Sequence, residues 1–271
     1  MLIAPPAEAA PAEADAAAAA PADDAVPVLV LRVGGTGSAS SAQSYIDALM
    51  DVAARVNGWA GARGKYFTSM KLAKGWVAAE KPHFGILSLV AYLSMRKKHG
   101  LSPVGTVQAA AAGGKQFYLI SSNAIDLAGC KGKTLATNLG GDAKFIDAVV
   151  AGDAFSLTDF EVEHTRRPVQ TIKKVIRGEA ECALIDDAQI GAMSKLEGGD
   201  ALQTVWFSPK LPSLIVTRFA NADDAEAKAF AENLPKICAG EGAKACGAAG
   251  IDALEAAPAD GLDALAAKYD G

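Results

Sequence analysis

The sequence predicts a two-lobed α/β protein in which each lobe contains a doubly wound, mainly parallel sheet. The main observation is a run of strand, helix, strand, helix and strand between Gly129 and Asp187, in which each strand ends in small polar or acidic residues. A second unit of the same kind begins at Val28. Such units form parallel sheets that bind ligands beyond the carboxyl ends of their strands, so two of them predict two lobes facing a cleft.

The first lobe is predicted from alternating apolar runs and helical spacings. Residues 28–33 form an apolar run that stops at a Gly/Ser-rich loop, and residues 42–56 carry apolar side chains at helical spacing until Asn57-Gly58. Further strands are expected at residues 65–69, 84–87 and 104–110, and further helices at residues 74–80 and 90–98. Residues 116–121 are expected to form a strand that leaves this lobe.

The second lobe is expected to cover residues 122–212, with its first and third strands at residues 134–137 and 182–187. A strand at residues 214–217 would return to the first lobe, and helices are expected at residues 222–239 and 261–268. The 271 residues exceed the usual size of one domain. The predicted division is a disordered tether of Ala, Pro and acidic residues at 1–26, a first lobe at 27–121 plus 213–271, and a second lobe at 122–212.

Composition and charge narrow the class of partner. The net charge of -5 argues against nucleic acid or an anionic membrane surface as the main partner, and aromatics at 6% leave little material for stacking bases. No apolar run approaches the roughly 18 residues of a membrane span. The first residues lack the basic start and apolar core of a signal peptide, yet a tether before a compact body suits an exported protein whose signal is absent from the chain.

The four cysteines predict two disulfides. No CxxC and no Cys/His spacing suited to zinc occurs. Cys130 and Cys182 lie at the amino-terminal edge of strands that are neighbours in a doubly wound lobe, and Cys238 and Cys246 lie close across a Gly-rich turn. Two such bonds indicate an oxidising compartment. The alternative is four buried free thiols in a cytosolic protein. No metal and no cofactor are predicted.

Two glycine-rich segments partly resemble phosphate-binding loops. Gly132-Lys133-Thr134 has Leu127 where a phosphate loop needs Gly, and it opens a strand rather than a helix, so we interpret it as a turn. The loop that begins at Gly35 resembles a dinucleotide fingerprint, but Ser40 replaces its third Gly and no acid-ended strand follows about 20 residues on.

The first loop nevertheless remains a candidate ligand contact. Its backbone N–H groups and the hydroxyls of Thr36 and Ser38 would point into a helix amino terminus, which suits a polar or anionic ligand group. The alternative is simple capping of that helix by Ser40 or Ser41.

No catalytic constellation is present in the sequence. The three histidines are scattered, and no HExxH, GxSxG or Cys–His signature occurs. Asp186 and Asp187 end a strand at the predicted cleft, where they are expected to contact ligand or bond the hinge. The alternatives for this pair are a solvated loop or a catalytic base.

Five segments in order resemble one known family. They are FGILSLVAYL, LAGCKGKTLA, VIRGEAECALIDD, WFSPKLPSLIVTR and the ending GIDALEAAPADGLDAL. From residue 28 to the end, the chain resembles the solute-binding proteins of ABC importers in the phosphonate-binding group, which have the type II periplasmic binding fold. The resemblance implies two lobes joined by two hinge crossings, closure of the lobes on a ligand, docking of the closed form on a transporter, and no enzymatic activity.

The resemblance also implies ligand-binding positions. Tyr92 could supply a stacking face and a hydroxyl, with ordinary helix packing as its alternative. Thr36 and Ser38 are added from the first loop. The positions carried over from the family are Lys71, Ser88, Tyr92, Thr137, Asn138, Asp142, Asp186, Asp187 and Leu214.

Departures from the family pattern argue against a phosphonate ligand. Asp142-Ala143-Lys144 stands where phosphonate binders have a Ser-Thr-Ser-like run, and a carboxylate at a helix start repels a second anion. Met70 or Lys71 replaces a tyrosine, and Leu214 replaces an acidic residue. The expected ligand is therefore neutral, cationic or largely apolar.

The sequence thus predicts an exported, periplasmic or envelope-anchored solute-binding protein that delivers a small ligand to an envelope transporter and acts as a monomer. One alternative is a carrier of a lipid or sterol on the same scaffold, with a widened apolar cleft. An alternative of another class is an enzyme that uses Asp186 or Asp187 as base, which would need a second catalytic group near the substrate. A sensor domain is the remaining alternative.

Overall fold

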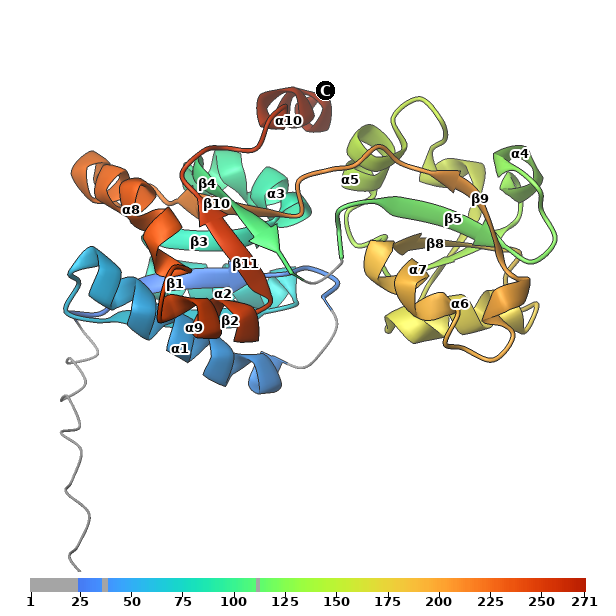
Figure 1. The fold of residues 1–271 in the computed structure, drawn as a ribbon. Helices are drawn as coiled ribbons and strands as arrows, with labels where there is room; N and C mark the ends of the chain where they lie inside the picture. The colour runs from blue at the N-terminus through green and yellow to red at the C-terminus, as the bar shows by residue number, and fades with distance from the viewer. Residues whose placement is uncertain (1–23, 36–38, 111–112) are drawn as a thin grey trace, which may run out of the picture.

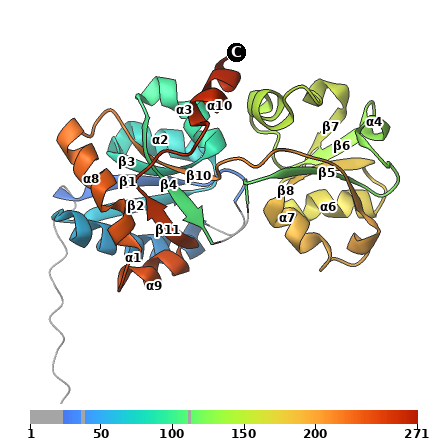
Figure 2. The same cartoon turned by 45° about the horizontal axis from the view of Figure 1, so that its top comes forward.

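The computed structural model describes residues 24–35, 39–110 and 113–271, and these form two α/β lobes that lie side by side (Figure 1). Each lobe has one sheet with helices on both faces. The second view also shows the two lobes side by side, with the last helix of the chain at the top between them (Figure 2). Most of the predicted tether, and the predicted contacts Thr36 and Ser38, lie outside the described residues.

The first lobe contains a sheet whose strand order is β11-β4-β10-β3-β1-β2. Pairs β1–β2 and β1–β3 are parallel, and β10 pairs antiparallel with β3 and β4. All residues of β3 are buried, as expected of a strand covered on both faces. The strands are β1 (Val26–Leu31), β2 (Ala62–Phe67), β3 (Phe84–Ser88), β4 (Ser102–Ala109), β10 (Leu214–Arg218) and β11 (Ile251–Glu255).

The second lobe contains a sheet whose strand order is β7-β6-β8-β5-β9. Strand β6 pairs parallel with β7 and β8, whereas β5 pairs antiparallel with β8 and β9. All residues of β8 are buried between helices. The strands are β5 (Phe117–Ser121), β6 (Thr134–Thr137), β7 (Glu161–His164), β8 (Cys182–Asp186) and β9 (Gln203–Phe207).

These pairings confirm the predicted fold class. In the first sheet β1 to β4 run in one direction, and only β10 and β11, which follow the return from the second lobe, run in the other. In the second sheet only β5, the strand that enters the lobe, is reversed. Each sheet is therefore mixed, with most of its strands running in one direction, and every antiparallel pair includes a strand that borders a crossing between the lobes. The strands β9 and β11 were not predicted from the sequence.

Helices follow most strands and cover both faces of each sheet. The predicted helix at residues 261–268 and the others at helical spacing are present, with bounds shifted by a few residues. Helix α5 continues into a π-helical stretch (Ile146–Ala151). The helices are α1 (Ala39–Asn57), α2 (Met70–Glu80), α3 (Leu89–His99), α4 (Leu127–Cys130), α5 (Ala143–Phe145), α6 (Pro168–Ile176), α7 (Asp187–Met193), α8 (Asp224–Ile237), α9 (Gly242–Ala248) and α10 (Leu262–Asp270).

Alternation along the strands divides the core. In β1, Val28 and Val30 pack with α1 and α8 on one face of the first sheet, while Leu29 and Leu31 pack with α2 and α3 on the other. The cluster on the α2/α3 face continues into the second lobe, where it includes Phe117 and residues of α5. One hydrophobic cluster therefore joins the lobes. Residues facing α6 form a separate cluster.

Two crossings connect the lobes and lie side by side. One leads from β4 to β5, and the other leads from β9 to β10. Ser208 N–H donates to Phe117 O at 2.8 Å, and Leu211 N–H donates to Lys115 O at 2.7 Å. Strand β5, which the predicted boundary after Ser121 assigns to the first lobe, pairs within the second sheet. The predicted residue boundaries of the lobes remain a prediction.

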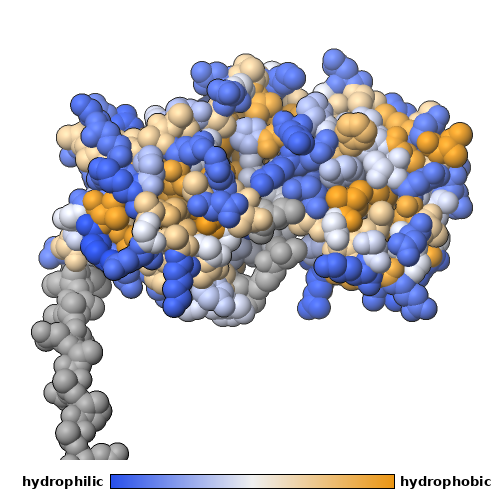
Figure 3. Space-filling view, in the orientation of Figure 1, coloured by the Kyte–Doolittle hydropathy of each residue, from blue (hydrophilic) through white to orange (hydrophobic). Residues whose placement is uncertain are grey.

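Both predicted disulfides are present: Cys130 is bonded to Cys182 and Cys238 to Cys246, with Cα–Cα distances of 6.0 Å and 5.5 Å. On the face drawn in Figure 3, hydrophobic residues lie in separate small areas among hydrophilic ones on both lobes. Among the described residues, no helix combines the length and apolarity needed to cross a bilayer.

Candidate functional site

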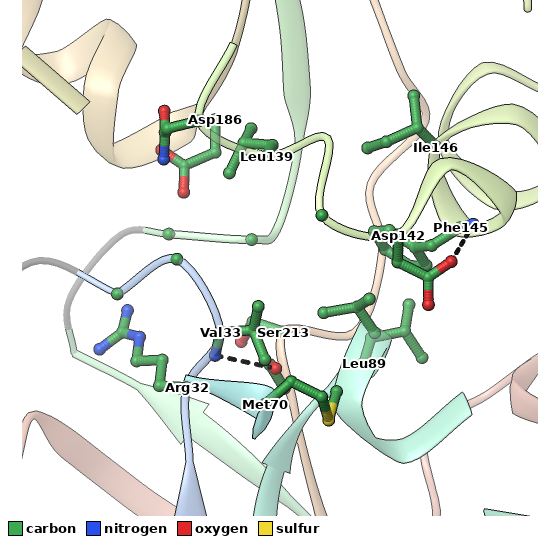
Figure 4. Close-up of a pocket in the computed structure, with 18 of the residues that line it drawn as sticks. Arg32, Val33, Met70, Leu89, Leu139, Asp142, Phe145, Ile146, Asp186 and Ser213 are labelled. Carbon is green, nitrogen blue, oxygen red and sulfur yellow. Dashed lines mark hydrogen bonds between the residues drawn. The ribbon is translucent and has the colours of Figure 1, made fainter. Parts of the chain in front are cut away.

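A cavity of about 380 Å³ lies between the lobes, beyond the carboxyl ends of strands from both sheets. This volume falls in the range of about 300–1,000 Å³ typical of small-molecule sites. Figure 4 shows Met70, Leu89 and Ser213 on one side of it and Leu139, Ile146 and Asp186 on the other. The residues whose side chains or backbone line it are Arg32, Val33, Gly34, Gly35, Ser69, Met70, Lys71, Lys74, Ser88, Leu89, Val90, Ser94, Gly113, Gly114, Phe117, Asn138, Leu139, Gly141, Asp142, Phe145, Ile146, Pro168, Asp186, Ala188, Gln189 and Ser213.

We define the first-lobe wall as the starts of α2 and α3 together with the end of β1. Both helices begin here without a side-chain cap. Neither the Ser69 hydroxyl before α2 nor the Ser88 hydroxyl before α3 accepts a hydrogen bond from the helix that follows it. The Ser88 hydroxyl instead accepts from Val33 N–H at 3.3 Å. Lys71 and Lys74, on the first turns of α2, are exposed at the edge of the cavity. This wall is therefore electropositive.

Ser213, at the end of the second crossing, completes this wall. Its carbonyl accepts a hydrogen bond from Leu89 N–H at 3.2 Å, which fixes the crossing to the start of α3. The residue is 8% exposed and its side chain faces the cavity. Within the described part of the chain, the Ser213 hydroxyl has no hydrogen-bond partner.

We define the second-lobe wall as the starts of α5 and α7 together with the end of β6. Carboxylate side chains of this wall cap both helix starts. Asp142 accepts from Phe145 N–H at 3.0 Å, and Asp186 accepts from Ala188 N–H at 3.1 Å and Gln189 N–H at 3.0 Å. Burial raises the pKa of the Asp186 carboxyl, and the Asp187 charge raises it further against the opposing backbone hydrogen bonds. The helix ends of this wall are thus already satisfied.

Apolar side chains cover most of the remaining surface of the second-lobe wall. Leu139 follows β6, and Phe145 and Ile146 face the cavity from α5 and its π-helical continuation. Phe145 and Ile146 belong to the cluster that joins the lobes. An apolar ligand body could therefore bury against this wall, with roughly 25 cal/mol gained for each Å² of apolar surface removed from water.

Asp187 binds the first crossing rather than the cavity. Its carboxylate accepts from Gly113 N–H and Lys115 N–H, each at 2.9 Å. Gly113 has φ of 134°, and a Cβ there would lie 2.9 Å from the Arg32 Nη2 atom. The positive φ favours glycine at this position, and a side chain there would also displace the Arg32 guanidinium.

The C-terminal helix α10 bridges the lobes at the edge of the cavity. It is held on α3 by Arg96, which donates to Asp270 Oδ1 at 3.0 Å. From there the Tyr269 hydroxyl reaches the second lobe and donates to Asp142 Oδ2 at 2.8 Å. Burial and the Asp142 carboxylate together raise the pKa of Tyr269 to about 12, so the hydroxyl stays protonated as a donor.

Of the nine predicted ligand residues that the structure describes, five line the cavity and four do not. Those that line it are Lys71, Ser88, Asn138, Asp142 and Asp186. Away from it lie Tyr92, Thr137, Asp187 and Leu214. A direct role in ligand binding remains a prediction for the first group.

Each residue of the second group has a packing or bonding role elsewhere. The Thr137 hydroxyl is fully buried and donates to Leu184 O at 2.9 Å. Tyr92 packs in the cluster on the α2/α3 face, and Leu214 packs on the opposite face of the sheet. Because successive strand residues alternate in direction, the neighbour Ser213 faces the cavity in place of Leu214.

The sequence did not single out the apolar residues of the cavity or Ser213. Met70 was noted only as a departure from the family pattern. The missed lining residues with the clearest chemistry are Arg32, Leu89, Leu139, Phe145, Ile146 and Ser213. Their position in the sequence could have identified them, because each lies within two residues of a strand end or on the first turn of a following helix. The described residues hold no cluster of His, Cys, Asp and Glu suited to a metal ion.

No protein-family model matches this sequence, and no curated protein matches it. Solved structures match its fold at low identity. XAC2383 from Xanthomonas citri, solved bound to ATP, is 12% identical with a TM-score of 0.68, covering 91% of this chain and 98% of that chain. PhnD1 from Prochlorococcus marinus, solved with methylphosphonate, is 7% identical with a TM-score of 0.64, covering 91% of this chain and 98% of that chain.

A binding-protein component of an ABC phosphonate transporter from Pseudomonas aeruginosa is similar as well. It is 15% identical with a TM-score of 0.63, and the alignment covers 90% of this chain and 88% of that chain. The periplasmic aliphatic sulphonate-binding protein SsuA from Escherichia coli has a TM-score of 0.60 at 11% identity, covering 91% of this chain and 86% of that chain. This likeness confirms the type II solute-binding fold.

Proposed function

We propose that this protein, which has the type II solute-binding fold, is an exported binding protein that captures a small ligand between its lobes and delivers it to an envelope transporter. The observation that carries the proposal is the cavity of about 380 Å³, lined from both lobes and placed beside two hydrogen-bonded crossings. Lobes joined in this way can close like a hinge on a ligand. The two disulfides support an oxidising compartment such as the periplasm.

The ligand we propose is not a phosphonate. Asp142 and Asp186 occupy the helix starts of the second-lobe wall, where a dianion would meet their charge. Carboxylates in this position repel an anion at the amino terminus that they already cap. Several similar structures bind phosphonates or sulphonates, which makes a phosphonate the alternative to test against.

Ligand screening by thermal unfolding tests the proposal. A ligand that binds only the folded protein stabilises it by about 2.7 kcal/mol at a hundredfold excess over Kd. A panel of phosphonates, amines, amino acids, organic acids and sterols should yield at least one such ligand, which should also reduce the radius of gyration in small-angle X-ray scattering. Stabilisation without compaction would contradict hinge closure, and methylphosphonate as the strongest ligand would contradict the proposed exclusion of phosphonates. Consumption of the bound ligand would indicate an enzyme instead.

A further inference from the structure

We infer that the cavity selects an amphipathic monoanion, with its anionic head on the first-lobe wall and its apolar body on the second-lobe wall. This inference rests on the proposed function, because it names the ligand class of the same cavity. Three observations on described residues carry it: the uncapped helix starts of the first-lobe wall, the unpartnered hydroxyl of Ser213, and the apolar surface opposite them.

The helix starts give the position of the head. Helices α2 and α3 each have 11 residues, and neither is capped by the side chain that precedes it. Their first N–H groups and the positive ends of their dipoles therefore face the cavity, apart from Leu89 N–H, which donates to Ser213 O. Such ends bind carboxylate, sulfonate or phosphate groups.

Ser213 is the independent observation that points to a ligand. Its side chain is buried except for its cavity-facing surface, with the residue 8% exposed, and no described residue bonds its hydroxyl. The hydroxyl is reachable from the cavity, so it is free to bond a ligand there. An anion at the start of α3 would accept from this hydroxyl. The Ser88 hydroxyl accepts from Val33 N–H, so its own proton is also available to such an anion.

Among the described residues, three cationic side chains (Arg32, Lys71 and Lys74) and two carboxylates line the cavity. Their charges nearly balance and favour one negative charge on the ligand over two. Lys71 and Lys74 form no ion pair within the described part of the chain and lie at the edge of the first-lobe wall. Opposite them, Asp142 and Asp186 are fixed as helix caps and stay in the cavity when a ligand enters. A second charge on the ligand would gain little from exposed lysines and would be repelled by the two carboxylates.

The opposite wall accounts for the apolar body. Phe145, Ile146 and Leu89 line the cavity but are already buried by the protein, and the apolar side chains left partly exposed to it are Leu139 on the second lobe and Met70 on the first. A ligand that is only a small anion would leave these side chains against water. An anion with a hydrocarbon body would cover them and remove its own chain from water.

Isothermal titration with a matched probe series tests the inference. Octanesulfonate, octanol, octylammonium and octyl phosphate share one octyl body, octanoate has one CH₂ group fewer, and acetate lacks the body. We expect octanoate and octanesulfonate to bind at least about tenfold more tightly than octanol or octylammonium, since a charge-assisted hydrogen bond contributes about 1.5–3 kcal/mol. Octyl phosphate at a mildly alkaline pH, where it carries two charges, should bind more weakly than octanoate, and acetate should be weaker by roughly a hundredfold or more.

Variants locate the head. Ser213→Ala should weaken octanoate about fivefold and octanol less, because charged acceptors form the stronger hydrogen bond. Lys71→Met should weaken octanoate about threefold, with the loss shrinking at high salt. Lys65→Met makes the same charge change at an exposed position of β2 outside the cavity and should leave the Kd unchanged.

The outcomes separate the inference from the proposed function. Tighter binding of octanol or octylammonium, or equal effects of Lys71→Met and Lys65→Met, would overturn the inference and leave a solute-binding protein for another class of ligand. Failure of the whole probe series would also overturn it. If the wider thermal screen still yields a ligand, only the inference falls, and if that screen yields none, the proposed function falls with it.

Discussion

The two walls of the cavity are built by the same local arrangement and differ in what occupies it. On each wall a strand ends at the cavity and a helix begins there. On the first-lobe wall the N-cap residues Ser69 and Ser88 leave their helices uncapped by side chains. On the second-lobe wall Asp142 and Asp186 accept hydrogen bonds from the helices they precede.

This difference shows how one fold can be tuned to different ligands. The parallel sheets bring positive helix ends to the cavity from both sides, whatever the sequence. The N-cap residue then decides whether the helix end is satisfied by the protein or left for a ligand. A carboxylate at one wall and a short hydroxyl at the other make the cavity electrostatically one-sided.

The two disulfides, one in each lobe, close chain segments of different length. Removing them is expected to give the largest changes in stability. Cys130–Cys182 joins residues 52 apart at the edge of β8, whereas Cys238–Cys246 joins residues 8 apart between α8 and α9. In the loop-entropy model, Cys130→Ala/Cys182→Ala should lower the free energy of unfolding by about 4 kcal/mol and Cys238→Ala/Cys246→Ala by about 2.5 kcal/mol. Urea denaturation followed by fluorescence measures both. Equal losses would show that loop length does not set the difference between the lobes.

A single exchange should make the second-lobe wall resemble the first. Asp142→Ser removes the carboxylate and keeps a good N-cap residue, so an anion at the start of α5 is no longer repelled. We expect the Kd for methylphosphonate to fall about tenfold. This corresponds to about 1.4 kcal/mol, which is our estimate for removing one repulsive charge contact. Titration calorimetry measures it. Asp126→Ser, which alters the exposed N-cap of α4, is the matched control, and an equal gain there would contradict the role given to Asp142.

The sequence predicted the fold well because its signals are local. Buried central strands such as β3 and β8 form apolar runs, and the helix over residues 42–56 shows apolar spacing that extends to α1 (Ala39–Asn57). The pairing of Cys130 with Cys182 followed from strand order alone. Strands β9 and β11 were missed because they lie at sheet edges and carry mixed polar and apolar residues.

The site was predicted less completely, because a cavity depends on side-chain direction. Ser213 and Leu214 are adjacent, yet one faces the cavity and the other packs below the sheet. Thr137 and Asn138 differ in the same way, since the Thr137 hydroxyl bonds Leu184 O inside the second sheet. One residue of register decides such cases, and a family pattern carried over without coordinates does not fix it.

A smaller effect is expected where α10 connects the two walls. Tyr269→Phe removes the hydroxyl that donates to Asp142 across the lobes. We expect the free energy of unfolding to fall by about 1 kcal/mol, and ligand affinity to fall up to about fivefold, because the closed arrangement loses a contact. Denaturation and calorimetry measure the two effects. Tyr45→Phe, at a residue that is 50% exposed on α1, is the control, and equal changes in both variants would refute a bridge.

The smallest effect is expected from the ionisation of Asp186, the N-cap residue of α7 on the second-lobe wall. Because burial raises the pKa of Asp186, the folded protein binds its proton more readily than the unfolded chain does. The stability that this residue contributes is therefore complete below the usual Asp pKa of about 3.9 and is lost as the pH rises through the raised value.

Asp186→Asn keeps an N-cap acceptor and removes the titration. The difference in unfolding free energy between wild type and Asp186→Asn should thus shift towards the variant as the pH rises from about 4 to neutral. Denaturation across that range measures it, with Asp126→Asn as an exposed N-cap control. A shift towards the wild type would mean that the backbone hydrogen bonds to Asp186 outweigh its burial, and that the carboxylate is an intrinsic part of the wall rather than a destabilising charge retained at the cavity.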